Sequence, residues 1–240
     1  MAHRPNILAL ASKISLESLT YTGITYSDPE YRILDPIVDD DMCSVMMRMR
    51  LETDFSAEDL AKKTRKSLDF VQTQCDKLVK AGVIRTRVRS GVLCYYYPIW
   101  VPGIMEGILS NREQCDAHPE LGACFEEYTR IRVGMLAPML GNGVNFMRVM
   151  PVMSAIENDT HKASYDEIST LIEKAWAISV GPCSCRRSRR LMGEGCGHLE
   201  EDICIAVGDM ATYAIETNKA RPATREEVME ILQRAEGNGF

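Results

Sequence analysis

Apolar side chains recur at helical spacing through the second quarter of the chain. This spacing is clear in residues 45–49, and the capping-box signature Ser56-x-x-Asp59 predicts a short helix that starts after Ser56. Ser67 then precedes a longer stretch with apolar residues three and four positions apart, and Gly82 follows where that helix should end. Three consecutive helices are therefore predicted in this part of the chain.

The pattern then changes to the alternation that is typical of β-strands. Residues 83–89 alternate in this way and residues 92–97 are a run of branched and aromatic side chains, and the turn residues Ser90-Gly91 between them predict a two-stranded hairpin. The order of three helices and a hairpin, with the runs "SAEDLAKKTRKSLDFVQTQCDKLVKAGVIRTR" and "YYYP", resembles winged helix-turn-helix domains of bacterial regulators. This resemblance implies a winged-helix module over residues 39–98.

The flanking segments are assigned from weaker patterns. Residues 1–38 show no sustained period and are treated as an N-terminal arm, and residues 99–144 as a helical connector. The elements expected in the last segment, residues 145–240, are a strand at 145–152, a helix capped by Ser164, a strand at 177–180, a helix over 202–217 and a helix capped by Thr224. The predicted fold class is mainly α with small β elements (α+β), a winged helix-turn-helix module followed by a helical, cysteine-containing cluster domain.

Composition excludes several classes of protein. An apolar content of 45% is ample for a folded core. No apolar run is long enough to predict a membrane span, and the short apolar run near the N-terminus is too brief for a secretory signal. We therefore expect a cytoplasmic protein that has no membrane partner.

Charge is distributed unevenly along the chain. The formal net charge is −6, yet residues 61–90 hold nine basic and two acidic side chains. This asymmetry favours a face for an anionic partner, although a solvated charged surface gives the same pattern. The candidate DNA or partner contacts are Lys62, Lys63, Arg65, Lys66, Arg85, Arg87 and Arg89. Because Asp69 and Asp76 lie on the predicted recognition helix, a structural or protein-docking use of the module stays an alternative to DNA binding.

The nine cysteines form two groups. Five stand singly among apolar residues, where thiols usually pack as small core side chains: Cys43, Cys75, Cys94, Cys115 and Cys124. Four are clustered near the C-terminus: Cys183, Cys185, Cys196 and Cys204. Such clustering in an intracellular composition is typical of metal ligation rather than of disulfides. Cys183 and Cys185 are expected on an extended segment, where thiolates one residue apart can reach neighbouring atoms of a polynuclear cluster, whereas a single zinc ion favours C-x2-C spacing.

The surroundings of the four cysteines favour an anionic cluster. Cys204 is expected in the first turn of a helix, where the positive end of the helix dipole would stabilise negative charge. Arginines at residues 186–190 would raise the potential of the cluster or dock an acidic redox partner. Two alternatives stay open. One is a structural zinc site in which His198 replaces a cysteine, and the other is the absence of any metal.

The stretch from "VGPCSCRRSRR" through "CGHLEEDICIAVGDMATYAIETNKARPATREEVMEILQRAEGNGF" resembles a family of ferredoxin-like 4Fe-4S proteins of anaerobic bacteria. In that family a winged-helix segment and an R-V-x-P-V strand, here residues 148–152, come before this region, so the resemblance runs from about residue 40 onward. The resemblance implies a 4Fe-4S cluster on Cys183, Cys185, Cys196 and Cys204, with Arg186 completing the C-x-C-R motif. Many members continue into a further cysteine-rich segment, so this sequence is expected to be either a fragment or a shorter relative.

Function is predicted from these features alone. No G-x-S-x-G, P-loop or G-x-G-x-x-G motif occurs, and no catalytic residue is assigned. We expect a non-catalytic electron carrier, or a component of a redox enzyme, that exchanges electrons with a redox partner protein. The alternative is a winged-helix transcription regulator that binds DNA and carries an iron–sulfur cluster or a structural zinc. The oligomeric state, including a homodimer, stays open.

Overall fold

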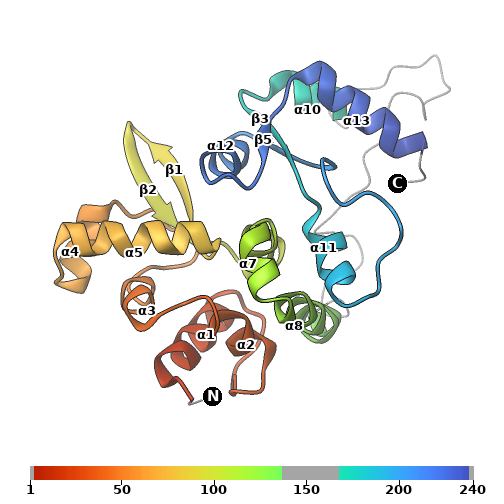
Figure 1. Cartoon of the computed structure of the whole chain (residues 1–240). Coiled ribbons are helices and arrows are strands. Elements are labelled where there is room, and N and C mark those ends of the chain that lie inside the picture. The colour runs from red at the N-terminus through yellow and green to blue at the C-terminus, as the bar shows by residue number, and fades with distance from the viewer. Residues whose placement is uncertain (1–2, 137–167, 238–240) are drawn as a thin grey trace. The chain divides into compact units, whose positions relative to one another are not determined.

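The protein is mainly helical with small antiparallel sheets, as the hydrophobic pattern predicts. The computed structural model describes residues 3–136 and 168–237 (Figure 1). The chain forms two compact units: unit 1 is Met1–Met139 with Ser184–Cys196, and unit 2 is Leu140–Cys183 with Gly197–Phe240. Among the helices of the described residues, none has both the length and the apolar composition needed to cross a lipid bilayer.

These units divide the chain differently from the segments expected from the sequence. The predicted arm, winged-helix module and most of the connector all belong to unit 1. Residues 184–196 also belong to unit 1, although they lie in the middle of the predicted cysteine domain. The strand expected at 145–152 and the helix expected after Ser164 lie outside the described residues.

Unit 1 combines short helices with one hairpin. Its elements are α1 (Pro5–Glu17), α2 (Pro29–Leu34), α3 (Asp40–Met46), α4 (Ala57–Thr64), α5 (Leu68–Ala81), β1 (Arg85–Arg89), β2 (Val92–Tyr96), η1 (Trp100–Ile104), α6 (Met105–Leu109), α7 (Arg112–Ala117), α8 (Glu120–Tyr128), η2 (Thr129–Val133), α9 (Gly134–Leu136) and α11 (Ser184–Leu191). The three helices and the hairpin predicted before residue 98 are α3, α4, α5, β1 and β2.

Local capping fixes the ends of α4 and α5 where the sequence predicts them. The Ser56 hydroxyl accepts a hydrogen bond from the Asp59 amide at 3.1 Å, and the Asp59 carboxylate accepts one from the Ser56 amide. Ser67 caps α5 in the same way. Gly82 ends α5 with φ of 85°, a left-handed conformation that glycine adopts without a steric penalty. Each N-cap of this kind stabilises a helix by about 1 kcal/mol.

The hairpin turn also follows the prediction. β1 and β2 pair antiparallel from Arg85↔Tyr96 to Arg89↔Val92. Both turn residues are left-handed, with φ of 51° at Ser90 and 78° at Gly91. A two-residue hairpin turn of this handedness matches the twist of its strands.

One hydrophobic core fills unit 1. Its fully buried side chains include Ile7, Leu10 and Ile14 of α1, Val71, Cys75 and Leu78 of α5, Leu121 and Phe125 of α8, and Trp100. Each such burial stabilises the fold by about 1.5–3 kcal/mol. Residues 1–38, for which the sequence shows no period, therefore supply two helices to the same core as α5.

A polar network also ties α1 to the end of β2. The Lys13 ammonium donates to the Met49 carbonyl at 2.8 Å and to the Tyr97 hydroxyl at 2.7 Å. The Tyr97 hydroxyl in turn donates to the Glu17 carboxylate. Burial acts to raise the pKa of Glu17, but the hydrogen bonds from Lys13 and Tyr97 outweigh it and hold that pKa below its ordinary value. The N-terminal segment is thus fixed by packing and by hydrogen bonds.

Unit 2 is a small sheet with helices. Its described elements are α10 (Ile168–Lys174), β3 (Ile178–Gly181), β4 (Cys204–Val207), α12 (Asp209–Glu216), β5 (Arg221–Pro222) and α13 (Arg225–Gly237). β3 lies between β4 and β5 and pairs antiparallel with both. Ile172, Val180, Val228 and Ile231 belong to its core. The strand expected at 177–180 is confirmed, and so is the Thr224 cap, which accepts from the Glu227 amide at 3.2 Å.

The single helix predicted over residues 202–217 is wrong. Its first part forms strand β4, and α12 begins only at Asp209. Alternating Ile203, Ile205 and Val207 suit a strand, because branched side chains pack well on a pleated surface. Gly208 then turns the chain with φ of 64° before the helix starts.

Candidate metal centre and basic surface

The nine cysteines differ sharply in exposure. The five isolated ones are buried, as predicted: Cys43, Cys75, Cys94, Cys115 and Cys124. Burial raises the pKa of Cys43 to about 11 and that of Cys75 to about 12. These two thiols therefore stay protonated and do not offer a thiolate to a metal. In the cysteine segment, defined as residues 183–204, Cys183 is half-buried and the others are exposed.

Cys185 lies in the first turn of α11, where the sequence predicts an extended segment. Its neighbour Ser184 is buried and opens the helix. The Ser184 hydroxyl donates to the Glu106 carbonyl at 3.4 Å and lies 3.3 Å from the Ser110 hydroxyl, both at α6. The residue between the first two cysteines therefore anchors the start of α11 within unit 1, while the Cys185 side chain faces solvent.

Two of the predicted cluster arginines hold α11 in place instead. Arg187 is 1% exposed, and its guanidinium donates to the Leu109 carbonyl at 2.8 Å. Arg189 forms ion pairs of 3.0 Å with Glu126 on α8 and with Glu194. Arg187 and Arg189 therefore stabilise the position of α11, whereas the sequence predicts that they act on the potential of a cluster. Of the other two arginines in this run, Arg186 is half-buried and Arg190 is exposed.

α11 and α8 approach each other closely at a glycine. A Cβ atom on Gly122 would lie 2.8 Å from the Leu191 Cβ and 2.9 Å from the Ser188 carbonyl oxygen. The Ser188 hydroxyl also donates to the Glu126 carboxylate at 2.9 Å. Glycine at this position therefore permits the contact that positions α11, and with it Cys185.

Cys183 and Cys204 lie together at one end of the sheet of unit 2. Cys204 is the first residue of β4, not of a helix, so the predicted helix-dipole stabilisation does not apply to it. It stands opposite Gly181 in β3, two positions before Cys183. The Cys183 amide donates to the Glu200 carbonyl at 2.7 Å, and the Ile203 amide donates to the Gly181 carbonyl at 3.2 Å. These bonds fix the backbone on both sides of the pair.

Cys196 and His198 are exposed and lie in the chain between α11 and β4. Cys185 and Cys196 belong to unit 1, whereas Cys183 and Cys204 belong to unit 2. In the part of the chain that the structure describes, no three His, Cys, Asp or Glu side chains are grouped so that they could hold a metal ion. The chemistry of the donor set nevertheless fits an iron–sulfur cluster, because accessible cysteine thiols are the ligands that such clusters use.

A second feature is the basic turn, which we define as Lys62 and Lys63 in the last turn of α4 together with Arg65 and Lys66 between α4 and α5. All four side chains are exposed. The Lys63 ammonium lies 5.4 Å from the centre of the Phe55 ring. The Lys66 ammonium lies at the same distance from the Phe70 ring. These cation–π contacts keep the alkyl chains on the surface and leave the charges accessible to an anionic partner.

The hairpin arginines are less accessible than the sequence predicts. Arg85 is 7% exposed and donates to the Gly103 carbonyl at 2.6 Å, so it is removed from the predicted contact surface. Arg87 and Arg89 pair with the same carboxylate, Asp54, at 2.6 and 3.5 Å. Burial acts to lower the pKa of Arg87, but the hydrogen bond and charge of Asp54 outweigh it and raise that pKa. Asp54 thus neutralises part of the charge predicted for this face.

Sequence reasoning missed the residues that position α11. Ser184 resembles a surface residue between two ligands, and nothing in the sequence indicates that it is buried. Gly122 carries a weak signal, because a glycine inside a helix costs about 1 kcal/mol relative to alanine and often marks close packing.

Comparison of the chain with protein-family models, with curated proteins and with solved structures gave no match. The cysteine segment and the basic turn are therefore the features from which a function can be inferred.

Proposed function

We propose that the chain is an iron–sulfur protein that holds a 4Fe-4S cluster through Cys183, Cys185, Cys196 and Cys204 and takes part in electron transfer. The observation that carries this proposal is the division of the cysteines. Five are buried in the core of unit 1, while four gather in one short segment with accessible side chains. Cluster assembly needs thiolates that iron can reach, and only the second group meets this need.

Contacts within the protein would hold the backbone of the cluster-binding cysteines in place. A bound cluster of this type supplies a centre that accepts and donates single electrons. Ser184, the residue between Cys183 and Cys185, is anchored on α6 by its hydroxyl, and the Cys183 amide donates to the Glu200 carbonyl. Arg186 follows Cys185 and completes the C-x-C-R motif. In this proposal the protein is cytoplasmic and exchanges electrons with a redox partner protein.

The finer fold assignment forms part of the same proposal. We infer that α3, α4, α5, β1 and β2 make a winged helix, and that the cysteine segment belongs to a cluster domain after it. The isolated bridges Leu51↔Tyr97 and Phe55↔Tyr95 support this, because they bring the segment before α4 alongside the end of the hairpin. The basic turn then lies at the start of α5, the helix that such modules place in a DNA groove.

Anaerobic purification with iron and sulfide analysis tests the cluster. We expect a brown protein with about four irons and four sulfides per chain and absorbance near about 400 nm. One zinc per chain without sulfide would favour the structural zinc alternative instead. A colourless protein that takes up no iron during anaerobic reconstitution would overturn the proposal.

The second candidate function is a DNA-binding regulator, favoured by the exposed basic turn. Binding of a mixed-sequence duplex should weaken with salt, with a log–log slope of about 0.9 for each phosphate that the protein contacts. The double variant Lys62→Gln, Lys66→Gln should reduce that slope by up to about 2. Lys174→Gln, an exposed lysine of α10, is the matched control and should leave the slope unchanged. Absence of binding at low salt rejects this function.

A further inference from the structure

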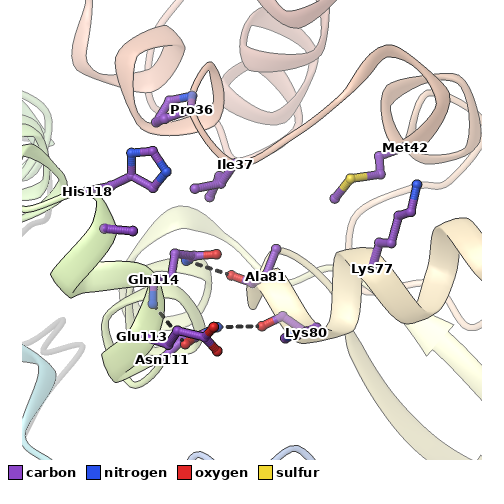
Figure 2. Close-up of a pocket in the computed structure, with 11 residues that line it drawn as sticks. Pro36, Ile37, Met42, Lys77, Lys80, Ala81, Asn111, Glu113, Gln114 and His118 are labelled. Carbon is purple, nitrogen blue, oxygen red and sulfur yellow. Dashed lines mark hydrogen bonds between the residues drawn. The ribbon is translucent and has the colours of Figure 1, made fainter.

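Unit 1 contains a pocket that neither the cluster nor the basic turn uses. It has a volume of about 380 Å³ and lies between the chain before and within α3, the last turns of α5, and α7 (Figure 2). Ligand pockets typically measure about 300–1,000 Å³, so this groove, although widely open to solvent, has room for a small organic molecule.

The walls of the pocket are held together by two amide side chains of the α7 region. The Asn111 amide donates to the Lys80 carbonyl at 3.0 Å, and the Gln114 amide donates to the Ala81 carbonyl at 3.1 Å (Figure 2). The Asn111 side-chain oxygen also caps α7 by accepting from the Gln114 backbone amide at 3.2 Å. These bonds satisfy carbonyls at the end of α5 and fix α7 against it, so two of the walls of the pocket are tied to each other.

The pocket combines apolar and cationic surface. Pro36, Ile37 and Met42 supply apolar side chains. Lys77 and Lys80 come from α5 three positions apart, which places them on one face of the helix. An organic anion with a short apolar body would match both kinds of surface.

Lys77 is available to such an anion. Its ammonium pairs with Asp39 at 3.4 Å, but both side chains are 49% exposed, and an exposed pair of this kind contributes little stability. Asp39 also caps α3, because its carboxylate accepts a hydrogen bond from the Met42 amide at 2.7 Å. A ligand carboxylate can therefore replace Asp39 at Lys77 without loss of the helix cap.

The charged residues of the lining indicate whether an acidic or a basic ligand fits the pocket. Among the described residues that line the pocket Glu113 is the single carboxylate, against the two lysines. His118 also lines the pocket, with its ring 3.3 Å from the Glu120 carboxylate. Within the lining two ammonium groups face one carboxylate, which favours an acid over an amine. Because Asp39 beside the lining offsets the charge of Lys77, this preference rests mainly on Lys80.

We propose that this pocket binds a small organic monocarboxylate, with the carboxylate at Lys77 and Lys80 and the apolar body against Ile37 and Met42. This binding function is separate from the iron–sulfur proposal and does not depend on it. Because α5 forms one wall and also begins next to the basic turn, an occupied pocket would brace the helix that presents that turn.

Methyl NMR of the full chain with phenylacetate as probe tests the proposal, using ¹³C-labelled methionine and Met42→Leu to assign the signal. We expect a saturable shift of the Met42 methyl with a Kd below about 1 mM, and binding of the uncharged phenylacetamide at least about tenfold weaker. No saturable shift up to about 10 mM, or equal binding of the amide, would overturn it.

Charge variants sharpen the same test. Lys77→Gln and Lys80→Gln should each weaken phenylacetate binding by about 3–10-fold, while Glu113→Gln should tighten it by about 2–5-fold. Lys80→Arg, which keeps the charge, should retain most of the affinity, and Lys174→Gln should have no effect. Unchanged affinity in both lysine-to-glutamine variants, or weaker binding in Glu113→Gln, contradicts the proposed carboxylate site. Unfolding midpoints of the variants confirm that each remains folded.

Discussion

The core of unit 1 and the cysteine segment use the same residue type in opposite ways. In the core, cysteine packs as a small apolar side chain, and Cys75 is fully buried on α5 between Val71 and Leu78. In the cysteine segment, cysteines lie at the start of α11 and at the end of the β3–β4 pair, and they are half-buried or exposed. The comparison teaches that exposure and local anchoring, rather than cysteine content, identify the thiols that are available for chemistry.

The largest effect that separates the two regions is expected in iron binding. Under the proposed function, Cys185→Ala should lose most of the about four irons per chain, because a cluster ligand is removed. Cys75→Ala should keep the iron content of the unmodified protein, since that thiol is buried in the core. Iron analysis after anaerobic reconstitution gives the result. An equal loss of iron in both variants would contradict the division into ligand and core cysteines.

Thiol alkylation should separate the two groups in the metal-free protein. At about pH 8 the raised pKa of Cys43 and Cys75 leaves roughly one thiol in a thousand or fewer ionised, and burial blocks the reagent as well. Peptide mass spectrometry after iodoacetamide treatment should show Cys185 and Cys196 labelled at least about 100-fold faster than these two. In concentrated urea the rates should converge, and rates that are already similar in the folded protein would refute the structural division.

Alkaline pH should destabilise unit 1 through its buried thiols. The pKa of Cys75 is about 12 in the folded chain against an ordinary value of 9.0. A raised folded pKa gives stability that is complete below the unfolded pKa and is lost as pH rises toward the folded one. Between about pH 8 and pH 10.5 this thiol should account for a loss of about 2 kcal/mol.

Urea unfolding measures that loss when Trp100, which is buried in unit 1, is the fluorophore and Trp176 is replaced by phenylalanine. In the Cys75→Ala background the decrease in unfolding free energy between the two pH values should be smaller by the same amount. A decrease of the same size with and without Cys75 would show that this thiol is not responsible.

An effect of similar size is expected at the contact that places α11. Gly122→Ala should lower the unfolding free energy of unit 1 by about 1–3 kcal/mol, because the added methyl group meets Leu191 and a backbone oxygen. Gly134→Ala is the matched control: its Cβ would meet nothing within 4 Å, and alanine there should be neutral or stabilising by up to about 1 kcal/mol. The same urea experiment compares them, and equal effects of both substitutions would remove Gly122 from this role.

Local signals in the sequence predicted much of unit 1. Ser56, Ser67 and Gly82 each act within a few residues, so the ends of α4 and α5 could be read directly. The buried position of Arg85 could not, because its hydrogen-bond acceptor Gly103 lies 18 residues away and has no signature. The strand pattern of β1 predicted the hairpin arginines as contact residues, but it did not show that residues around Gly103 cover Arg85 at the start of the strand.

The cysteine segment was predicted less well, because contacts between residues far apart in the sequence also determine its structure. Its ligand residues were identified from spacing, whereas the elements that carry them were not. Cys204 was assigned to a helix although alternating branched residues and Gly208 favour strand β4 and a turn. Cys185 was assigned to an extended segment, since the buried Ser184 that starts α11 depends on α6, far away in sequence.

The path of α11 has a consequence for how the molecule can be divided. The chain leaves unit 2 after Cys183, forms α11 within unit 1, and returns to unit 2 at Gly197. The two units are therefore not successive modules, and no single cut yields both intact. A truncated fragment of residues 1–136 would lose the helix that covers α8 at Gly122. Any transplant or recombination of unit 1 must carry residues 184–196 with it, grafted through an artificial linker.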